Sequence, residues 1–152
     1  MFIKDFLKQY DKKKVNFYID MDGVIADYNV GEARNYDIKR PLTDSIKKLK
    51  KISKMKNVNL YILSVTRMNR GINEKNKWLD KNVPFVKKEN RYILSREAND
   101  FRLSKDLKTS YLKSTMDRDA VNILIDDDPR ILNDVRDNIP SFVLLKDTAL
   151  VD

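Results

Sequence analysis

Five short apolar runs, separated by stretches with helical periodicity, are the feature that most constrains how this chain can fold. The runs fall at residues 15–19, 58–65, 91–94, 121–125 and 141–145. Each has the length and composition of a β-strand. Strands that alternate with helices form mostly parallel sheets, because right-handed crossovers place the helices on the faces of the sheet. The pattern therefore predicts an α/β fold, a Rossmann-like three-layer sandwich around a mostly parallel five-stranded sheet.

The stretches between these runs predict the helices. Apolar residues recur at helical spacing over about 2–11, 43–56, 71–82 and 129–138. Residues 1–14 thus hold an N-terminal amphipathic helix that packs on the body. Thr43 or Asp44 is expected to cap the second helix. Residues 95–119 are polar and partly helical, and their expected buried set is Leu103, Leu107, Tyr111 and Leu112.

The composition excludes several kinds of chemistry. The 152 residues suit a single domain over 1–152, and they include neither cysteine nor histidine. A disulfide framework, a thiol nucleophile, a Ser-His-Asp triad and a histidine-ligated zinc site are therefore ruled out. A bound metal must have oxygen ligands, which favours magnesium, manganese or calcium.

The net charge of +8, from 31 basic and 23 acidic residues, suits an anionic partner such as a nucleotide or nucleic acid. A solvated lysine surface explains the same charge without a partner, and both interpretations stay open. No stretch has the length and hydrophobicity of a membrane span, and no signal-peptide pattern is visible. We expect a cytoplasmic protein without a membrane partner.

Polar side chains follow three of the predicted strands at the point where each strand ends. Asp20 and Asp22 follow the first, Ser64 ends the second, and Asp126 and Asp127 follow the fourth. The carboxyl ends of parallel strands lie at one edge of the sheet, where such folds bind ligands. If these strands are neighbours, four carboxylates and a hydroxyl converge, and Mg²⁺ is the natural ion to neutralise them.

A phosphate substrate would also need a cation to hold its oxygens. The segment between the third and fourth strands offers Lys105, Lys108 and Lys113. Gly23, directly after the two aspartates, lets the backbone turn sharply where a side chain would obstruct it. These residues make the edge of the sheet the candidate site.

The strand ends resemble the motifs of the haloacid dehalogenase superfamily. Residues 20–27, Asp-Met-Asp-Gly-Val-Ile-Ala-Asp, are similar to its first motif, DxDGx(T/V). Ile-Leu-Ser at 62–64 resembles the second motif, and Ile-Leu-Ile-Asp-Asp-Asp-Pro at 123–129 resembles the fourth. The likeness spans about residues 15–145, and the motifs stand in the family's order. It implies a phosphatase that works through an aspartyl-phosphate.

The resemblance assigns roles to the acidic residues. Asp20 would be the nucleophile, and Asp22 would protonate the leaving oxygen and then deprotonate the hydrolytic water. Mg²⁺ would be held by the Asp20 carboxylate, the backbone carbonyl of Asp22 and Asp126. Asp127 would orient a metal-bound water or the lysine.

Ser64 and a lysine would hold the phosphoryl oxygens. Lys108 is the expected lysine, with Lys105 as the alternative, because Asp100-Phe-Arg102 before it is similar to the 3′-phosphatase domain of phage-type polynucleotide kinases. The remaining expected contacts to the substrate are Gly23, Thr66, Arg67 and Arg102.

The family's cap domain has too little chain here, so we expect no large cap domain and only a short flap over 28–41. An open site suits a nucleotide or a phosphorylated nucleic-acid end. Two branches compete. Polynucleotide 3′-phosphatases are favoured by Lys-Trp-Leu at 77–79, Asp100-Phe-Arg102 and the basic charge, whereas 5′(3′)-deoxyribonucleotidases are favoured by Gly-Val-Ile-Ala-Asp at 23–27 and Ile-Asp-Asp-Asp-Pro at 125–129. A Mg-dependent nuclease and a phosphate-binding or regulatory module without turnover are the alternatives from other classes.

Overall fold

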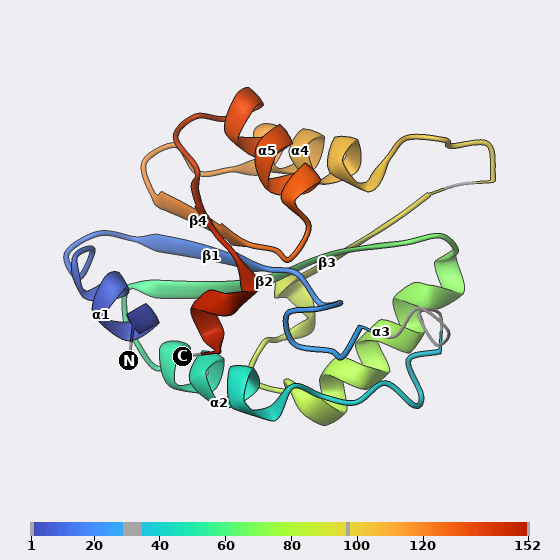
Figure 1. Cartoon of the computed structure of the whole chain (residues 1–152), viewed down its shortest axis with the longest axis horizontal. Helices are drawn as coiled ribbons and strands as arrows, with labels where there is room; N and C mark the ends of the chain where they lie inside the picture. The colour runs from blue at the N-terminus through green and yellow to red at the C-terminus, as the bar shows by residue number, and fades with distance from the viewer. Residues whose placement is uncertain (1, 29–34, 97, 152) are drawn as a thin grey trace.

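A five-stranded sheet forms the centre of the protein in a computed structural model that describes residues 2–28, 35–96 and 98–151 (Figure 1). Its strands are β1 (Val15–Ile19), β2 (Val58–Thr66), β3 (Arg91–Ser95), β4 (Val121–Ile125) and β5 (Val143–Leu145). They lie in the order β3-β2-β1-β4-β5, and every pairing is parallel. This confirms the predicted parallel α/β sheet and places the first strand at its centre.

Helices cover both faces of the sheet and complete the three layers. They are α1 (Phe2–Lys8), α2 (Thr43–Ile52), α3 (Asn69–Asn82), α4 (Ser104–Thr115) and α5 (Pro129–Asn138), with short 3-10 turns η2 (Lys88–Asn90) and η3 (Asp147–Leu150). α4 and α5 lie on one face, and α1, α2 and α3 lie on the other (Figure 1). None of the helices in the described part of the chain is long and apolar enough to cross a membrane.

β1 is buried along its whole length because it has a paired strand on each side and a packed helical layer on each face. Phe17 and Ile19 belong to the core under α1, α2 and α3, whereas Tyr18 belongs to the core under α4 and α5. Ile19 lies opposite Ile62 of β2 and Ile125 of β4. This register brings the polar residues that follow these three strands to the same level.

Three local expectations were wrong. The N-cap of α2 is Leu42, and neither Thr43 nor Asp44 caps it with a side chain. The helix ends at Ile52 rather than near 56, because tight turns from Lys51 to Lys54 and from Ile52 to Met55 replace the helical bonds. Leu103 is exposed rather than buried, since it precedes the first turn of α4 and its N–H donates to Asp106.

The chain after the first motif folds back along the edge of the sheet. Asp27 N–H donates to Arg40 O at 2.8 Å, and Leu42 N–H donates to Ile25 O at 2.8 Å. These bonds hold residues 35–41, the described part of the expected flap, against residues 25–27. Residues 29–34 of that flap lie outside the described residues. No second domain covers the sheet edge in the described ranges, in agreement with the expectation of no large cap.

Candidate active site

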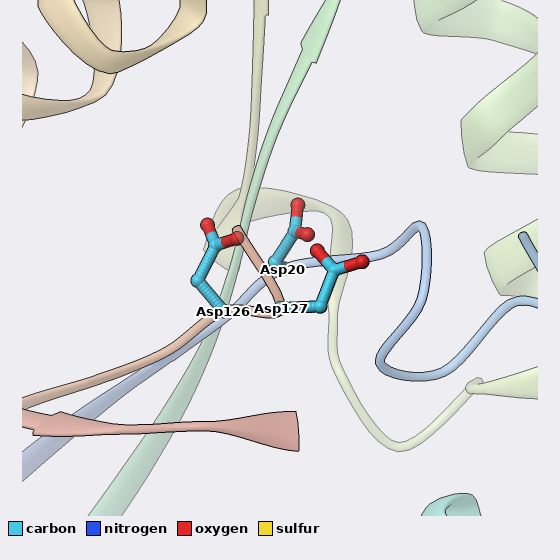
Figure 2. Close-up of side chains that lie close together, drawn as sticks. All are labelled: Asp20, Asp126 and Asp127. Atoms are coloured by element: carbon cyan, nitrogen blue, oxygen red, sulfur yellow. The ribbon is translucent and has the colours of Figure 1, made fainter. Parts of the chain in front are cut away.

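Carboxylates gather where β1 and β4 end. Asp20 follows β1 and Asp126 follows β4, and both are buried. Figure 2 shows them beside Asp127 with the three carboxylates close together. One oxygen from each lies within 4.8 Å of the others. Ser64 of β2 is buried at the same edge, so the structure brings together the strand-end residues that the sequence singled out.

Lys108 of α4 lies between two of these carboxylates. Its Nζ donates to Asp20 Oδ1 at 2.8 Å and to Asp126 Oδ2 at 2.8 Å. Burial lowers the pKa of Lys108, but its attraction to Asp20 and Asp126 outweighs that effect and raises the pKa above its usual value. Lys108 is therefore a fixed positive charge inside the site.

The carboxyl cluster fits a divalent cation with oxygen ligands. Burial raises the pKa of Asp20 well above its usual value; the charge of Lys108 opposes this and the charge of Asp126 adds to it. Burial and the neighbouring Asp126 raise the pKa of Asp127 to about 6. Carboxyls that are hard to ionise need further positive charge, and oxygen donors at this spacing suit Mg²⁺.

Gly23 allows Asp127 to approach the turn after β1. Its φ is +81°, a conformation that residues with a side chain rarely adopt. A Cβ at this position would lie 2.0 Å from Asp127 Oδ2. Gly23 is thus required twice, for its backbone angle and for the space it leaves.

Asp22 is surrounded by donors from outside the predicted motifs. Its Oδ1 accepts hydrogen bonds from the Tyr36 hydroxyl and from Lys39 Nζ. Its Oδ2 lies 3.7 Å from Lys75 Nζ. Burial raises the pKa of Asp22, but Lys75, Lys39 and Tyr36 together outweigh that effect and lower it below the usual value. Asp22 is therefore held as a carboxylate in the free protein.

The segment 35–41, which supplies Tyr36 and Lys39 to Asp22, packs against α3. Trp78 Nε1 donates to Lys39 O at 2.9 Å, and the Tyr36 ring meets the Trp78 ring edge-on with centroids 5.9 Å apart. Lys39 Nζ also lies 4.6 Å from the centroid of the Tyr36 ring. This part of the flap therefore forms one wall of the site.

Lys75 of α3 is a site residue that the sequence analysis missed. Its Nζ donates to Ser64 Oγ at 2.6 Å and to Val65 O at 2.9 Å. Lysine on a helix usually indicates a solvated face. The available signal was position: Lys75 lies three residues after Ile72 and three before Trp78, and so falls within the apolar stripe of the helix.

Two residues near the motifs lie outside the cluster. Lys105 Nζ is 3.6 Å from Asp106 and 3.6 Å from Asp134, so of the two candidate lysines it is Lys108 that contacts the carboxylates of the site. Asp128 caps α5 by accepting a hydrogen bond from Arg130 N–H at 2.9 Å. Its neighbour Asp127 is the one that belongs to the cluster.

The expected substrate contacts lie at the rim. Thr66 ends β2 and packs closely against Gly71 of α3. A Cβ added to Gly71 would lie only 2.0 Å from Thr66 Oγ1. Arg67 follows it and is exposed. Arg102 pairs with Asp100, to which its Nη2 donates at 2.7 Å. Among the described residues, no hydrogen bond or ion pair joins these three side chains to the carboxylates of the cluster.

Taken together, the geometry places two carboxyls, Asp20 and Asp22, two residues apart with lysines around both. The Asp20 carboxylate sits at the end of the central strand, where the nucleophile of a phosphoryl transfer needs a fixed position. Lys108, Lys75 and the Ser64 hydroxyl are the donors that an anionic phosphoryl group requires.

Solved structures of low sequence identity have this fold. A chain of the Pnkp1/Rnl/Hen1 RNA repair complex matches with 18% identity and a TM-score of 0.69, over 89% of this chain and 42% of that one. The N-terminal part of a Bacteroides fragilis protein, containing a phosphatase domain and complexed with Mg, matches with 18% identity and a TM-score of 0.58, over 92% and 38%.

A third similar structure is the HAD domain of the effector protein Lem4 from Legionella pneumophila, with 13% identity and a TM-score of 0.53, over 88% of this chain and 85% of that one. Neither family models nor curated proteins match the chain at the level of sequence. The chain spans less than half of the repair-complex chain and of the Bacteroides protein. These likenesses show a haloacid-dehalogenase-type fold.

Proposed function

We propose that this haloacid-dehalogenase-type domain is a Mg-dependent phosphomonoesterase that acts on phosphorylated nucleic-acid ends or nucleotides. One observation carries the proposal: Asp20 is buried at the end of the central strand with Lys108 Nζ at 2.8 Å, beside an acid–base carboxyl and the Lys75–Ser64 pair. This is a nucleophile with cations placed around the position that a phosphoryl group would take.

In the first half of the reaction an Asp20 oxygen attacks phosphorus. The new oxygen–phosphorus bond forms as the bond to the leaving oxygen breaks, which gives an aspartyl-phosphate. Asp22 supplies the proton that the leaving oxygen needs. Lys39, Lys75 and Tyr36 hold Asp22 ionised in the free protein. The negative charge of the phosphoryl group offsets the charge of these lysines when the substrate binds, so Asp22 takes up a proton from solution before it donates one.

In the second half Asp22, now a carboxylate, removes a proton from a water that attacks phosphorus. The bond to Asp20 breaks and inorganic phosphate leaves. Asp22 then releases to solution the proton that it took from the water, so both aspartates return to their starting states. Lys39 and Tyr36 keep the Asp22 carboxylate in one orientation during this step. Lys108, Lys75 and Ser64 hold the phosphoryl oxygens throughout.

Asp20, Asp126 and the backbone carbonyl of Asp22 would hold Mg²⁺, and Asp127 would orient its water. When bound, the ion supplies positive charge that offsets the charge of the phosphoryl oxygens.

Support for a nucleic-acid end comes from three observations. No large cap domain covers the site in the described residues, so the edge of the sheet is accessible to a large substrate. The net charge is +8. One structure with this fold belongs to an RNA repair complex. A mononucleotide is the second candidate, because the first and fourth motifs also resemble the 5′(3′)-deoxyribonucleotidases.

A phosphatase screen with Mg²⁺ tests the proposal. Mononucleotides and oligonucleotides with 3′- or 5′-phosphates are compared, with Asp20→Asn as the inactive control and Asp119→Asn, an exposed aspartate, as the matched active one. We expect phosphate release by all variants except Asp20→Asn. Cleavage of phosphodiesters without phosphate release would favour a nuclease, and binding of phosphate without turnover would favour a regulatory module. Release from mononucleotides alone would exclude the polynucleotide end.

A further inference from the structure

The connection from β3 to α4 extends the active-site edge beyond the carboxylates (Figure 1). It is attached to the end of β2, because Arg96 N–H donates to Thr66 O at 3.2 Å. Ser95 Oγ also donates to Asn69 Oδ1 at 2.9 Å, which ties β3 to the start of α3. Ser95 and Arg96, which lead into residues 98–103, therefore lie beside Thr66 and Asn69, the residues on either side of Arg67 and Met68.

An ion pair organises this connection and leaves an aromatic ring outside. Asp100 Oδ1 accepts from Arg102 N–H at 3.0 Å, and both Asp100 oxygens accept from the Arg102 guanidinium. Arg96 Nη1 donates to Arg102 O at 3.0 Å. Phe101, between the paired residues, is 86% exposed. The loop is held in place by these bonds, and its exposed aromatic ring is accessible to a ligand.

A cavity lies along the same residues. It measures about 1010 Å³ and is lined by Ser95, Ala98, Asn99, Asp100, Phe101 and Arg102. This is the upper end of the size range of small-molecule sites in proteins. The cavity is thus large enough for a nucleotide beside the exposed ring.

Exposed arginines and an exposed apolar side chain also lie just after β2, next to the residues that hold this connection. Arg67 and Arg70 are exposed at the start of α3, with Met68 between them. Arg96 Nε is buried and has no hydrogen-bond partner among the described residues. Isolated apolar residues between arginines are typical of a surface that stacks bases and pairs with phosphates, whereas a protein interface has a continuous apolar centre.

We propose that this surface, Arg67, Met68, Arg70 and residues 98–103, binds the single-stranded nucleotides next to the terminal phosphate of a nucleic-acid substrate. A base stacks on Phe101, and the phosphodiesters lie against Arg67 and Arg70. The inference rests on the proposed function and deepens it, since it selects polynucleotide ends over mononucleotides. The positive charge of the chain complements the charge of such a strand.

The test compares Phe101→Ala with Phe101→Trp, which keeps the stacking face. The matched control is Phe2→Ala, which removes a ring that is 55% exposed in α1. Substrates are p-nitrophenyl phosphate and 3′-phosphorylated single strands of one to ten nucleotides, as DNA and as RNA. We expect Phe101→Ala to raise KM for the longer strands about tenfold, with Phe101→Trp and Phe2→Ala close to wild type. Turnover of p-nitrophenyl phosphate stays within twofold for all variants.

Binding of a fluorescent ten-nucleotide strand without a terminal phosphate separates this inference from the proposed function. We expect binding by the wild type and about tenfold weaker binding by Phe101→Ala. For Arg70→Gln we expect the plot of the logarithm of the binding constant against the logarithm of the salt concentration to have a slope that is about 0.7 shallower. Equal binding by the wild type and Phe101→Ala would overturn the inference even if phosphatase activity is present. Weaker binding by Phe101→Ala supports the inference even if no phosphate is released.

Discussion

At the scale of single residues, three buried lysines surround the carboxylates of the site. The side chains of Lys39, Lys75 and Lys108 are only 1%, 5% and 3% exposed. A buried ammonium is costly unless it is paired, and each of these lies beside an aspartate. The pairs fix the charges in place before substrate arrives, which is how electrostatic stabilisation of a reacting phosphoryl group is achieved.

Replacing Lys108 tests whether it is the lysine that serves the phosphoryl group. We expect Lys108→Met to lower kcat/KM by roughly 10²–10³, because one fixed donor to the reacting group is lost. Lys105→Met should stay within about twofold of the wild type, since Lys105 pairs with Asp106 and Asp134 at the protein surface. Steady-state kinetics measures both. Equal losses in the two variants would contradict this assignment.

Gly23 and Gly71 form a second matched pair. Gly23→Ala is expected to lower the free energy of unfolding by roughly 1–3 kcal/mol and to reduce activity strongly, because φ is +81° and Asp127 occupies the space. A Cβ on Gly71 would meet the Thr66 side chain, with Oγ1 at 2.0 Å and Cβ at 3.0 Å, but φ of Gly71 is not positive and alanine favours helix, so the loss for Gly71→Ala is expected to be smaller than that for Gly23→Ala. Urea unfolding gives both values. A Gly23→Ala variant as stable as the wild type would contradict the claim that position 23 must be glycine.

The site residues at strand ends could be predicted from the sequence, whereas those on helices and loops could not. Asp20, Asp126 and Ser64 follow or end apolar runs, so their position in the fold follows from the strand itself. Tyr36 and Lys39 come from an irregular polar segment without periodicity, and only tertiary packing against Trp78 brings them to Asp22. Roles that depend on such packing leave no local pattern.

At the scale of elements, the connection between β3 and α4 owes its shape to Asp100. Hydrogen bonds from the Arg102 side chain and backbone lower the pKa of Asp100 to about 2. Because the pKa in the folded state lies below the value of 3.8 for the free group, this contribution to stability is present above about pH 4. It is lost as the pH falls through about 2.

A carboxyl titration checks the Asp100–Arg102 pair. NMR of the Asp100 side chain should give a midpoint near 2 in the wild type. Arg102→Ala removes the guanidinium bonds, so we expect the midpoint to move up toward the value of the free group. An unchanged Asp100 midpoint in the variant would show that the pair does not form.

Strands were predicted more accurately than the loops between them. β1 and β4 have the expected limits, because a buried parallel strand is a continuous apolar run with a sharp polar end. The limits of α2 depend on a cap and on tight turns whose residues are compatible with several conformations. Exposure of Leu103 likewise depends on the loop before α4, which has no repeating pattern.

At the scale of the whole molecule, the strand order places the candidate site at the ends of the central strands of the sheet. β1 lies between β2 and β4, so Asp20, Ser64 and Asp126 come from the ends of three adjacent strands. The sequence predicted a parallel sheet but left the adjacency of these strands open. Strand order depends on pairing between distant segments, for which local patterns carry no information.

Metal binding should stabilise the whole domain. At a Mg²⁺ concentration 100-fold above its Kd, we expect about 2.7 kcal/mol of added stability. For a chain of this length that raises Tm by roughly 5–10 °C. Asp126→Asn should lose the rise because it removes a carboxylate of the cluster. Asp128→Asn, which keeps a capping side chain on α5, should retain it. Thermal unfolding with and without Mg²⁺ measures the effect. An equal rise in Tm for both variants would contradict the assignment of Asp126 to the metal site.

Trapping of the covalent intermediate tests the central claim, that Asp20 is the nucleophile of a phosphomonoesterase. The Asp22→Asn variant lacks the base for the second half of the reaction. With ³²P-labelled p-nitrophenyl phosphate, whose leaving group needs no proton from Asp22, it should therefore accumulate phosphoryl-enzyme that is recovered after acid quenching. The account predicts the label on the peptide that contains Asp20, and none in the Asp20→Asn,Asp22→Asn double variant. Label on another residue, or phosphate release by Asp20→Asn at the wild-type rate, would contradict it.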